Sequence, residues 1–291
     1  MDNKKILEAG EIASKTVKYA KEIIKKDVPL IEIAEKIEEK IVELGGKPAF
    51  PTNLSIDDIA AHYTPTYNDE TKAHGLLKID LGVHVNGFVA DTAFSVDLEN
   101  SEENKKLIET AEQTLENAIK ITKKGTKLNE IGKTIQETIE SEDFSPIINL
   151  SGHSIEEYDL HAGITIPNHD NGNTEELDKG LIAIEPFVTT GSGKVYDGKP
   201  SGIYHLIDEK TPRTTIARKV LNFIQQEYKS LPFCQRWLVN NFGTKALFAI
   251  KQLEDNGNLH NYPQLIEASH KPVAQAEHTL LIDDEVIITT K

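Results

Sequence analysis

The sequence contains a single cysteine, Cys234, among its 291 residues. One thiol cannot form an internal disulfide framework, and such sparse cysteine usage is typical of a reducing compartment. No segment approaches the roughly 18 apolar residues that a membrane-spanning helix needs, and the first residues lack the apolar core of a signal peptide. We therefore predict a cytoplasmic protein without a membrane partner.

Basic side chains are outnumbered by acidic ones. Lys and Arg number 32 against 47 Asp and Glu, which gives a formal net charge of −15 and disfavours a nucleic-acid partner. The sequence has no GxSxG nucleophile motif, no phosphate-binding P-loop and no GxGxxG fingerprint. Hydrophobic residues (38%) and charged residues (27%) are otherwise present in the proportions of an ordinary globular protein.

Helical and strand-like patterns alternate along the chain. Apolar residues recur at helical spacing in residues 3–26, between Pro29 and Gly45, and in residues 101–123 and 128–141. Residues 78–96 form two β-rich runs around Asn86-Gly87, a strong hairpin signal. Short strand-like runs follow at 146–150, 161–166 and 181–189, and the last residues read as a closing hairpin. This order predicts an α+β layered domain.

Residues 200–262 depart from this rhythm. Pro212 is expected to open a helix at its first position, and most large aromatic side chains of the second half follow, among them Trp237, Phe242 and Phe248. We predict a helical insertion subdomain of residues 200–262 within a main domain formed by residues 1–199 and 263–291.

Asp80 and Asp91 each interrupt an apolar strand, where a carboxylate is costly to bury unless it is paired or bound to a metal. If Asn86-Gly87 is a two-residue turn, residue 82 faces Asp91, and Asp80 becomes its diagonal neighbour at roughly 7 Å. Such carboxylates can converge on two metals about 3.5–4 Å apart. Two aspartates that face water on an edge strand remain the alternative.

Three further residues stand in comparable contexts. Glu185 and Glu277 lie in apolar strand-like runs, and His153 lies in a run of small residues that reads as a turn after residues 146–150. Each of them alone is more commonly an exposed or structural side chain. Together, four carboxylates and one imidazole suit Co, Mn, Fe or Zn, and the four negative charges balance two divalent cations.

Five motifs then occur in a fixed order: KIDLG, ADTAF, GHSIEEYDLHAG, AIEPF and AEHT. With the flanking AFPTNLSIDDIAAHYTP, they resemble the methionine aminopeptidases of the type II, archaeal and eukaryotic branch, over essentially the whole chain. One departure is Leu181-Ile182, where the family usually has an aromatic residue.

The resemblance implies a fold and a reaction. The fold would be α+β of the pita-bread type, with pseudo-twofold halves around a central, largely antiparallel sheet and the helical insertion added. The reaction would be removal of the N-terminal initiator methionine when the second residue is small. It would proceed by attack of a metal-activated hydroxide on the first peptide bond.

The resemblance also implies the roles of the metal ligands. Asp91 and Glu277 would bridge two divalent ions (Co, Mn, Fe or Zn), Asp80 would complete one ion, and His153 with Glu185 the other. Glu185 would in addition accept a proton from the attacking water.

Substrate contacts follow from the same likeness. His62 and His161 would contact the substrate and stabilise charge on the scissile carbonyl, and Phe50 and Leu160 would line the methionine pocket. The expected partners are nascent polypeptide N-termini that begin with Met and, transiently, the ribosome, with a monomer as the expected state. A proline-directed peptidase of the same fold and a non-catalytic scaffold relative are the alternative functions.

Overall fold

The computed structural model describes residues 2–291. Helices α1 (Asn3–Ile23) and α2 (Leu30–Glu43) open the chain, and α3 (Glu102–Ile121) and α4 (Leu128–Glu140) follow the first hairpin. All four helices were predicted, although α1 ends earlier than residue 26 because Ile24 is extended. Asp2 and Ser101 accept backbone N–H groups at the starts of α1 and α3, as N-cap residues do.

The strands of the described chain pair antiparallel throughout. In chain order they are β1 (Lys47–Ile56), β2 (Ile59–Ala61), β3 (Leu76–Val85), β4 (Phe88–Asp97), β5 (Ser145–Pro146), β6 (Ser151–Ile155), β7 (Thr165–Pro167), β8 (Gly180–Ile184), β9 (Phe187–Thr189), β10 (Val195–Leu206), β11 (Phe233–Cys234), β12 (Leu259–Glu267), β13 (Val273–Gln275), β14 (His278–Ile282) and β15 (Val286–Ile288). They form the sheets β1-β3-β4, β11-β10-β12-β2, β13-β9-β5 and β15-β14-β8-β6-β7.

The hairpin of β3 and β4 has the predicted register. Asn86 and Gly87 both have positive φ, at 53° and 92°, as a two-residue hairpin turn of type I′ requires. Gly82 therefore pairs with Asp91, and Asp80 pairs with Ala93 two positions further along. The two aspartates are diagonal neighbours on one face of the sheet.

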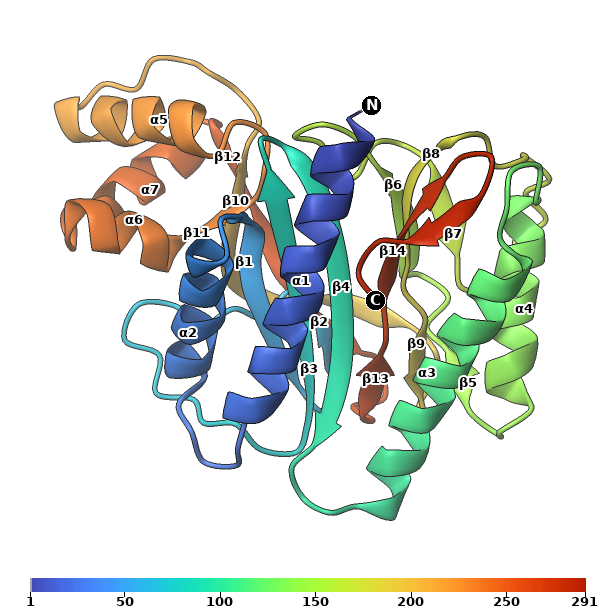
Figure 1. Cartoon of the computed structure of the whole chain (residues 1–291). Helices are drawn as coiled ribbons and strands as arrows, with labels where there is room; N and C mark the ends of the chain where they lie inside the picture. The colour runs from blue at the N-terminus through green and yellow to red at the C-terminus, as the bar shows by residue number, and fades with distance from the viewer. Residues whose placement is uncertain (1) are drawn as a thin grey trace.

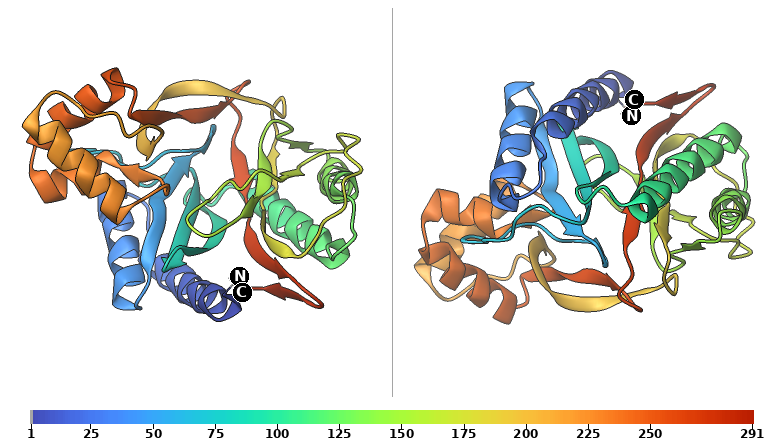
Figure 2. Two further views of the ribbon diagram at one scale, coloured as in Figure 1. Left: turned by 90° about the horizontal axis from the view of Figure 1, so that it is seen from above. Right: turned by 90° about the horizontal axis from the view of Figure 1, so that it is seen from below.

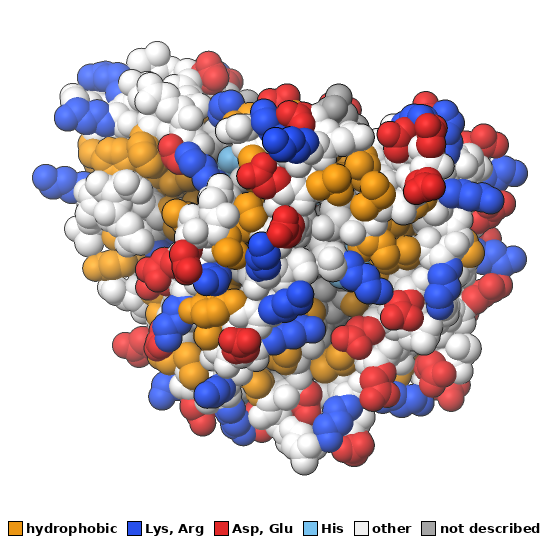
Figure 3. Space-filling view, viewed as in Figure 1, with side chains coloured by type: hydrophobic (Ala, Val, Ile, Leu, Met, Phe, Trp, Pro, Cys, Tyr) orange, Lys and Arg blue, Asp and Glu red, His pale blue; other side chains and the backbone are white. Residues whose placement is uncertain are grey.

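One helix pair covers the strands of each half of the molecule (Figures 1 and 2). Helices α1 and α2 pack on the β1-β3-β4 sheet through one apolar cluster, and α3 and α4 pack near β8 and β14 through another. Acidic and basic side chains are intermingled on the face of Figure 3. Within residues 2–291, no helix is long and apolar enough to cross a membrane. The predicted α+β, largely antiparallel fold is confirmed.

Hydrogen bonds join β4 to the segment of β13 and β14. Ser95 Oγ donates to the carbonyl of Gln275 at 2.8 Å, and the Gln275 N–H donates back to Ser95 Oγ at 2.9 Å. The Glu277 N–H donates to the carbonyl of Ala93 at 2.9 Å. These hydrogen bonds hold the two halves of the molecule together beside Asp91 and Glu277.

The helices of the second half lie between β10 and β12. They are α5 (Thr215–Glu227), α6 (Gln235–Phe242) and α7 (Lys245–Asp255), and they share an apolar core of their own. The expectation that Pro212 opens a helix is wrong, because Thr214 caps α5 and Pro212 lies before it. Strands β10 and β12 run through both predicted boundaries of the insertion, so the division at 200 and 262 stays a prediction.

Candidate metal centre

Three side chains with metal-binding atoms meet at the junction of the two halves. Asp91 comes from β4, His153 from β6, and Glu277 lies directly before β14. One ligand atom of each lies within 4.8 Å of the others, and His153 Nε2 is 3.7 Å from Asp91 Oδ2. All three side chains are buried. Carboxylate and imidazole groups that converge in this way can hold a divalent cation.

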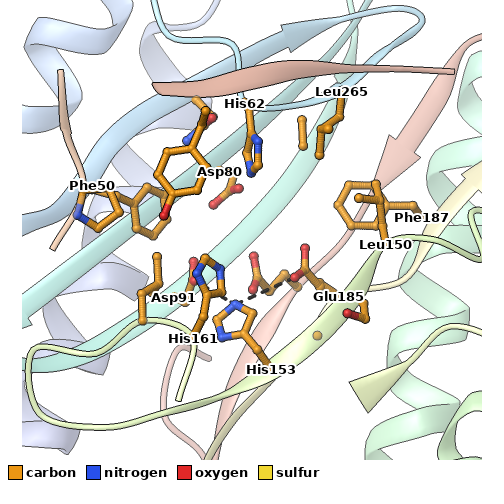
Figure 4. A pocket seen from close by; sticks show the side chains of 18 of the residues that line it. Phe50, His62, Asp80, Asp91, Leu150, His153, His161, Glu185, Phe187 and Leu265 are labelled. Carbon is orange, nitrogen blue, oxygen red and sulfur yellow. Dashed lines mark ion pairs between the residues drawn. The ribbon is translucent and has the colours of Figure 1, made fainter. Parts of the chain in front are cut away.

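Asp80 and Glu185 line the same cavity. Glu185 directly follows β8, and its Oε1 is 3.8 Å from His153 Nε2. Its second oxygen accepts a hydrogen bond from Gln275 Nε2 at 3.3 Å. Figure 4 shows Asp80 and Asp91 on one side of the cavity and Glu185 on the other, with dashed ion pairs at His153. The structure therefore brings all five predicted ligands together.

The local structure at His153 differs from the predicted turn. His153 lies in the middle of β6, paired with Ala183 of β8 and Thr165 of β7. A Cβ at Gly152 would clash with the Ala183 carbonyl. Gly152 therefore allows β6 and β8 to approach each other, and the small residues around His153 form part of a strand instead of the predicted turn.

Burial perturbs every titratable group of the cluster. It raises the pKa of Asp80 to about 7. Burial and the charges of Asp80 and Glu185 raise the pKa of Asp91 well above its ordinary value. Burial and the charges of the other three carboxylates raise the pKa of Glu277 in the same way. Burial lowers the pKa of His153 to about 3, which keeps the imidazole neutral. Four such carboxylates ionise together only beside compensating positive charge.

The unpaired oxygens of the site fit bound cations. Asp80 Oδ1 and Asp91 Oδ1 are buried without a hydrogen-bond partner among the described residues. A buried carboxylate oxygen without a partner is costly unless a cation satisfies it. Within residues 2–291, no Lys or Arg lines the cavity. The donor set therefore calls for positive charge from outside the chain, which divalent metal ions supply.

The cavity has a volume of about 370 Å³ and combines acidic, imidazole and apolar walls. Phe50 of β1 and Leu160 line it and are nearly buried, with 6% and 8% exposure. His62 and His161 line it as well, and the His153 and His161 rings lie 4.5 Å apart between centroids. The four predicted substrate-contact residues thus line one cavity together with the acidic cluster, and Figure 4 labels three of them, Phe50, His62 and His161.

His62 is held in an unusual backbone conformation directly after β2. Its φ is +63°, which is uncommon for a residue with a Cβ. Its Nδ1 lies 3.2 Å from the carbonyl oxygen of Pro263, and its ring meets the Tyr262 ring edge-on at 5.4 Å. Burial lowers the pKa of His62 to about 4. The ring is therefore neutral, and because a carbonyl only accepts, Nδ1 carries its proton.

Several wall residues were not singled out from the sequence. Ile203, Pro232, Tyr262 and Leu265 line the cavity from β10, from the segment before β11 and from β12. Gln275, the partner of Glu185, also escaped notice. Its position two residues before Glu277 was the one available signal, since strand residues two apart share a face.

Comparison with known proteins agrees with this site. Residues 4–284 match metallopeptidase family M24, and the chain belongs to that family. The chain is 46% identical to the methionine aminopeptidase of Pyrococcus abyssi, with 100% of both chains covered. The predicted resemblance to methionine aminopeptidases, over the whole chain, is therefore confirmed.

Solved structures show the same fold at lower identity. Methionine aminopeptidase from Thermotoga maritima matches with a TM-score of 0.71 at 23% identity, covering 99% of this chain and 96% of that one. Prolidase from Pyrococcus furiosus matches with a TM-score of 0.61 at 18% identity, covering 100% of this chain and 64% of that one. The chain is a metal-dependent hydrolase of this family.

Proposed function

We propose that this protein removes the N-terminal methionine from nascent proteins and peptides whose second residue is small. The observation that carries the proposal is the convergence of four carboxylates and His153 beside a partly apolar cavity. Full-length relatives at 46% identity that are named methionine aminopeptidase support the same activity.

Two divalent ions, of Co, Mn, Fe or Zn, would be held by the five acidic and imidazole side chains. Asp91 and Glu277 would bridge the ions, as the family resemblance implies. Asp80 would complete one ion, and His153 with Glu185 the other. Ions of this kind lower the pKa of a bound water, which supplies a nucleophile for hydrolysis near neutral pH. The orphaned oxygens of Asp80 and Asp91 support this assignment.

Glu185 would accept the proton of the attacking water. Without a bound cation, burial and the charge of Asp80 raise its pKa well above the ordinary value for a glutamate, and a bound cation favours the ionised carboxylate that can accept a proton. The hydrogen bond from Gln275 fixes one of its oxygens. The other oxygen lies 3.8 Å from His153 Nε2 and would serve both the ion and the water.

The substrate would lie between the histidines and the apolar wall. Phe50 and Leu160 would contact the methionine side chain. Because Nδ1 of the neutral His62 ring carries its proton toward Pro263, its Nε2 is an acceptor. His62 would therefore accept a hydrogen bond from an N–H of the substrate. His161 alone would stabilise charge on the scissile carbonyl, a role that the family resemblance gave to both histidines.

The wider setting of the reaction forms part of the same proposal. The partners would be nascent chains that begin with Met and, transiently, the ribosome, and the protein would work in the cytoplasm as a monomer. Residues 1–199 and 263–291 would form the catalytic domain and residues 200–262 an insertion that closes one wall of the pocket. Ile203, Pro232 and Tyr262, which line the cavity from within residues 200–262, support that last role.

Peptide cleavage by the metal-loaded protein tests the function. Met-Ala-Ser, Met-Asp-Ser and Ala-Pro-Ser would be incubated in parallel, and free amino acids would be quantified. We expect release of methionine from Met-Ala-Ser alone. Cleavage of Ala-Pro-Ser without Met-Ala-Ser would establish the proline-directed alternative, and no cleavage by folded, metal-loaded protein would establish the non-catalytic one.

A further inference from the structure

A buried ion pair joins the helical insertion to the first half of the chain. Glu38 of α2 and Arg236 of α6 are 198 positions apart in sequence and form two parallel hydrogen bonds. Arg236 Nη1 lies 2.7 Å from Glu38 Oε2, and Nη2 lies 2.9 Å from Oε1. Their exposures are 7% and 2%. Figure 1 shows α6 beside α2 at this point.

The remaining hydrogen-bonding capacity of the pair is directed at neighbouring segments. Trp237 Nε1 donates to Glu38 Oε2 at 2.8 Å, and the Thr52 N–H donates to Oε1 at 3.2 Å. Arg236 Nε donates to the carbonyl of Pro65 at 3.3 Å. The two buried charges are thus bound to three different segments of the chain.

Those segments carry the walls of the substrate cavity. Thr52 lies in β1 between the cavity residues Phe50 and Asn53. Its carbonyl accepts the Thr64 hydroxyl at 2.8 Å, two residues after His62. Pro232, another wall residue, precedes Arg236 by one short strand. We name the set of Glu38, Arg236 and Trp237 the clamp.

We propose that Glu38 and Arg236 are positioning residues that set the place of His62 and of the apolar wall relative to the acidic cluster. The proposal rests on the proposed function. A buried ion pair adds little net stability compared with apolar side chains of similar size. The guanidinium fork does, however, fix direction as well as distance. The clamp contacts none of the five proposed metal ligands, so its effect falls on substrate placement.

The decisive variant replaces both charges at once. Glu38→Met combined with Arg236→Met fills the space with unbranched apolar side chains, so neither charge is left buried without its partner. The Thr52 N–H, the Trp237 indole and the Pro65 carbonyl lose their partners. We therefore expect a folded protein with a lowered thermal midpoint and a calorimetric metal affinity close to that of the unchanged protein. The KM for Met-Ala-Ser should rise, and kcat/KM should fall on the order of tenfold to a hundredfold.

A milder variant and a matched control accompany the double variant. Trp237→Phe removes one hydrogen-bond donor to Glu38 and keeps both charges; it should raise the KM for Met-Ala-Ser by less than the double variant does. Lys47 and Glu227 form an exposed ion pair at 2.6 Å that also joins β1 to the insertion without lining the cavity. Lys47→Met should leave KM and kcat unchanged.

The outcomes separate the clamp from the proposed function. A stable double variant with unaltered KM would overturn the positioning role while wild-type cleavage of Met-Ala-Ser leaves the function intact. Unfolding of every clamp variant would show a purely structural pair and overturn it as well. A wild-type protein that fails to cleave Met-Ala-Ser would instead refute the function on which the proposal rests.

Discussion

The hydroxyl of Thr279 binds both backbone groups of Asp91. The Asp91 N–H donates to Thr279 Oγ1 at 2.8 Å, and the same hydroxyl donates to the Asp91 carbonyl at 2.8 Å. Thr279 lies two residues after Glu277, on β14. One side chain of the second half thereby fixes the backbone beneath a proposed bridging ligand of the first half.

Thr279→Val tests this connection. Valine keeps the shape but leaves two buried backbone groups unpaired, each of which costs about 1–3 kcal/mol. We expect the free energy of unfolding to fall by at least about 2 kcal/mol and the metal affinity to weaken. Thr279→Ser, which keeps the hydroxyl, is the control. Equal stability and metal affinity in both variants would contradict the connection.

Asp91→Asn and Glu277→Gln each remove one negative charge from the proposed bridge. We expect methionine release and metal binding to be lost together, measured by peptide cleavage and by calorimetric titration of metal into stripped protein. Asp284→Asn removes the same charge from an exposed turn and should change neither. Full activity and full metal content in Asp91→Asn would refute its assignment as a ligand.

His62→Ala removes a proposed substrate contact and no proposed ligand. Metal content should stay unchanged while kcat/KM for Met-Ala-Ser falls on the order of a hundredfold. His74→Ala, at an exposed position of the following segment, should behave like the unchanged protein. Loss of metal from the His62 variant, determined by elemental analysis, would place this imidazole among the ligands.

Gly82 leaves room for the ring of Phe50 in the proposed methionine pocket. A Cβ at Gly82 would clash with that ring. Gly82→Ala should therefore displace Phe50 and raise the KM for Met-Ala-Ser, with metal content unchanged. Gly180→Ala adds the same methyl group on β8, where no neighbour lies within 4 Å. An unchanged KM in the Gly82 variant would show that Phe50 does not define the pocket.

Glu267 should make stability depend on acid pH. It is fully buried. Burial alone raises its pKa, but hydrogen bonds from Lys271, Ser192 and Ser269 outweigh this and lower the pKa to about 2 from 4.5. A carboxylate whose pKa is lower in the folded than in the unfolded protein stabilises the fold at pH values above its unfolded pKa. That stabilisation is lost as the pH falls toward its folded pKa.

Glu267→Gln therefore should lower the thermal midpoint at pH 7 by several degrees. The difference between variant and unchanged protein should shrink between about pH 4.5 and pH 2. Differential scanning calorimetry over this range measures it. A difference that stays constant with pH would show that the hydrogen bonds do not favour the ionised carboxylate.

The sequence was sufficient for the parts of the fold and site that depend on local pattern. The Asn86-Gly87 turn determines the register of its hairpin, so the spacing of Asp80 and Asp91 around that turn is enough to place them as diagonal neighbours. Ordered motifs then indicated His153, Glu185 and Glu277, which the structure gathers around one cavity.

Other features depend on contacts between distant segments. The pairing of Glu38 with Arg236 spans 198 positions and leaves no periodic signal in either helix. The strand position of His153 was missed because β6 is short and contains Gly152, which reads as a turn until packing against β8 is known. Pro212 was interpreted by local preference alone, whereas the Thr214 cap determines where α5 begins.

The central claim is that the acidic cluster holds the metals that enable methionine removal. The most direct measurement is methionine release from Met-Ala-Ser by chelator-stripped protein, before and after addition of Co, Mn, Fe or Zn. The account predicts no release from the stripped protein and restored release with at least one of these metals. Undiminished release in the presence of excess chelator, or no release by folded protein with any of the metals bound, would contradict it.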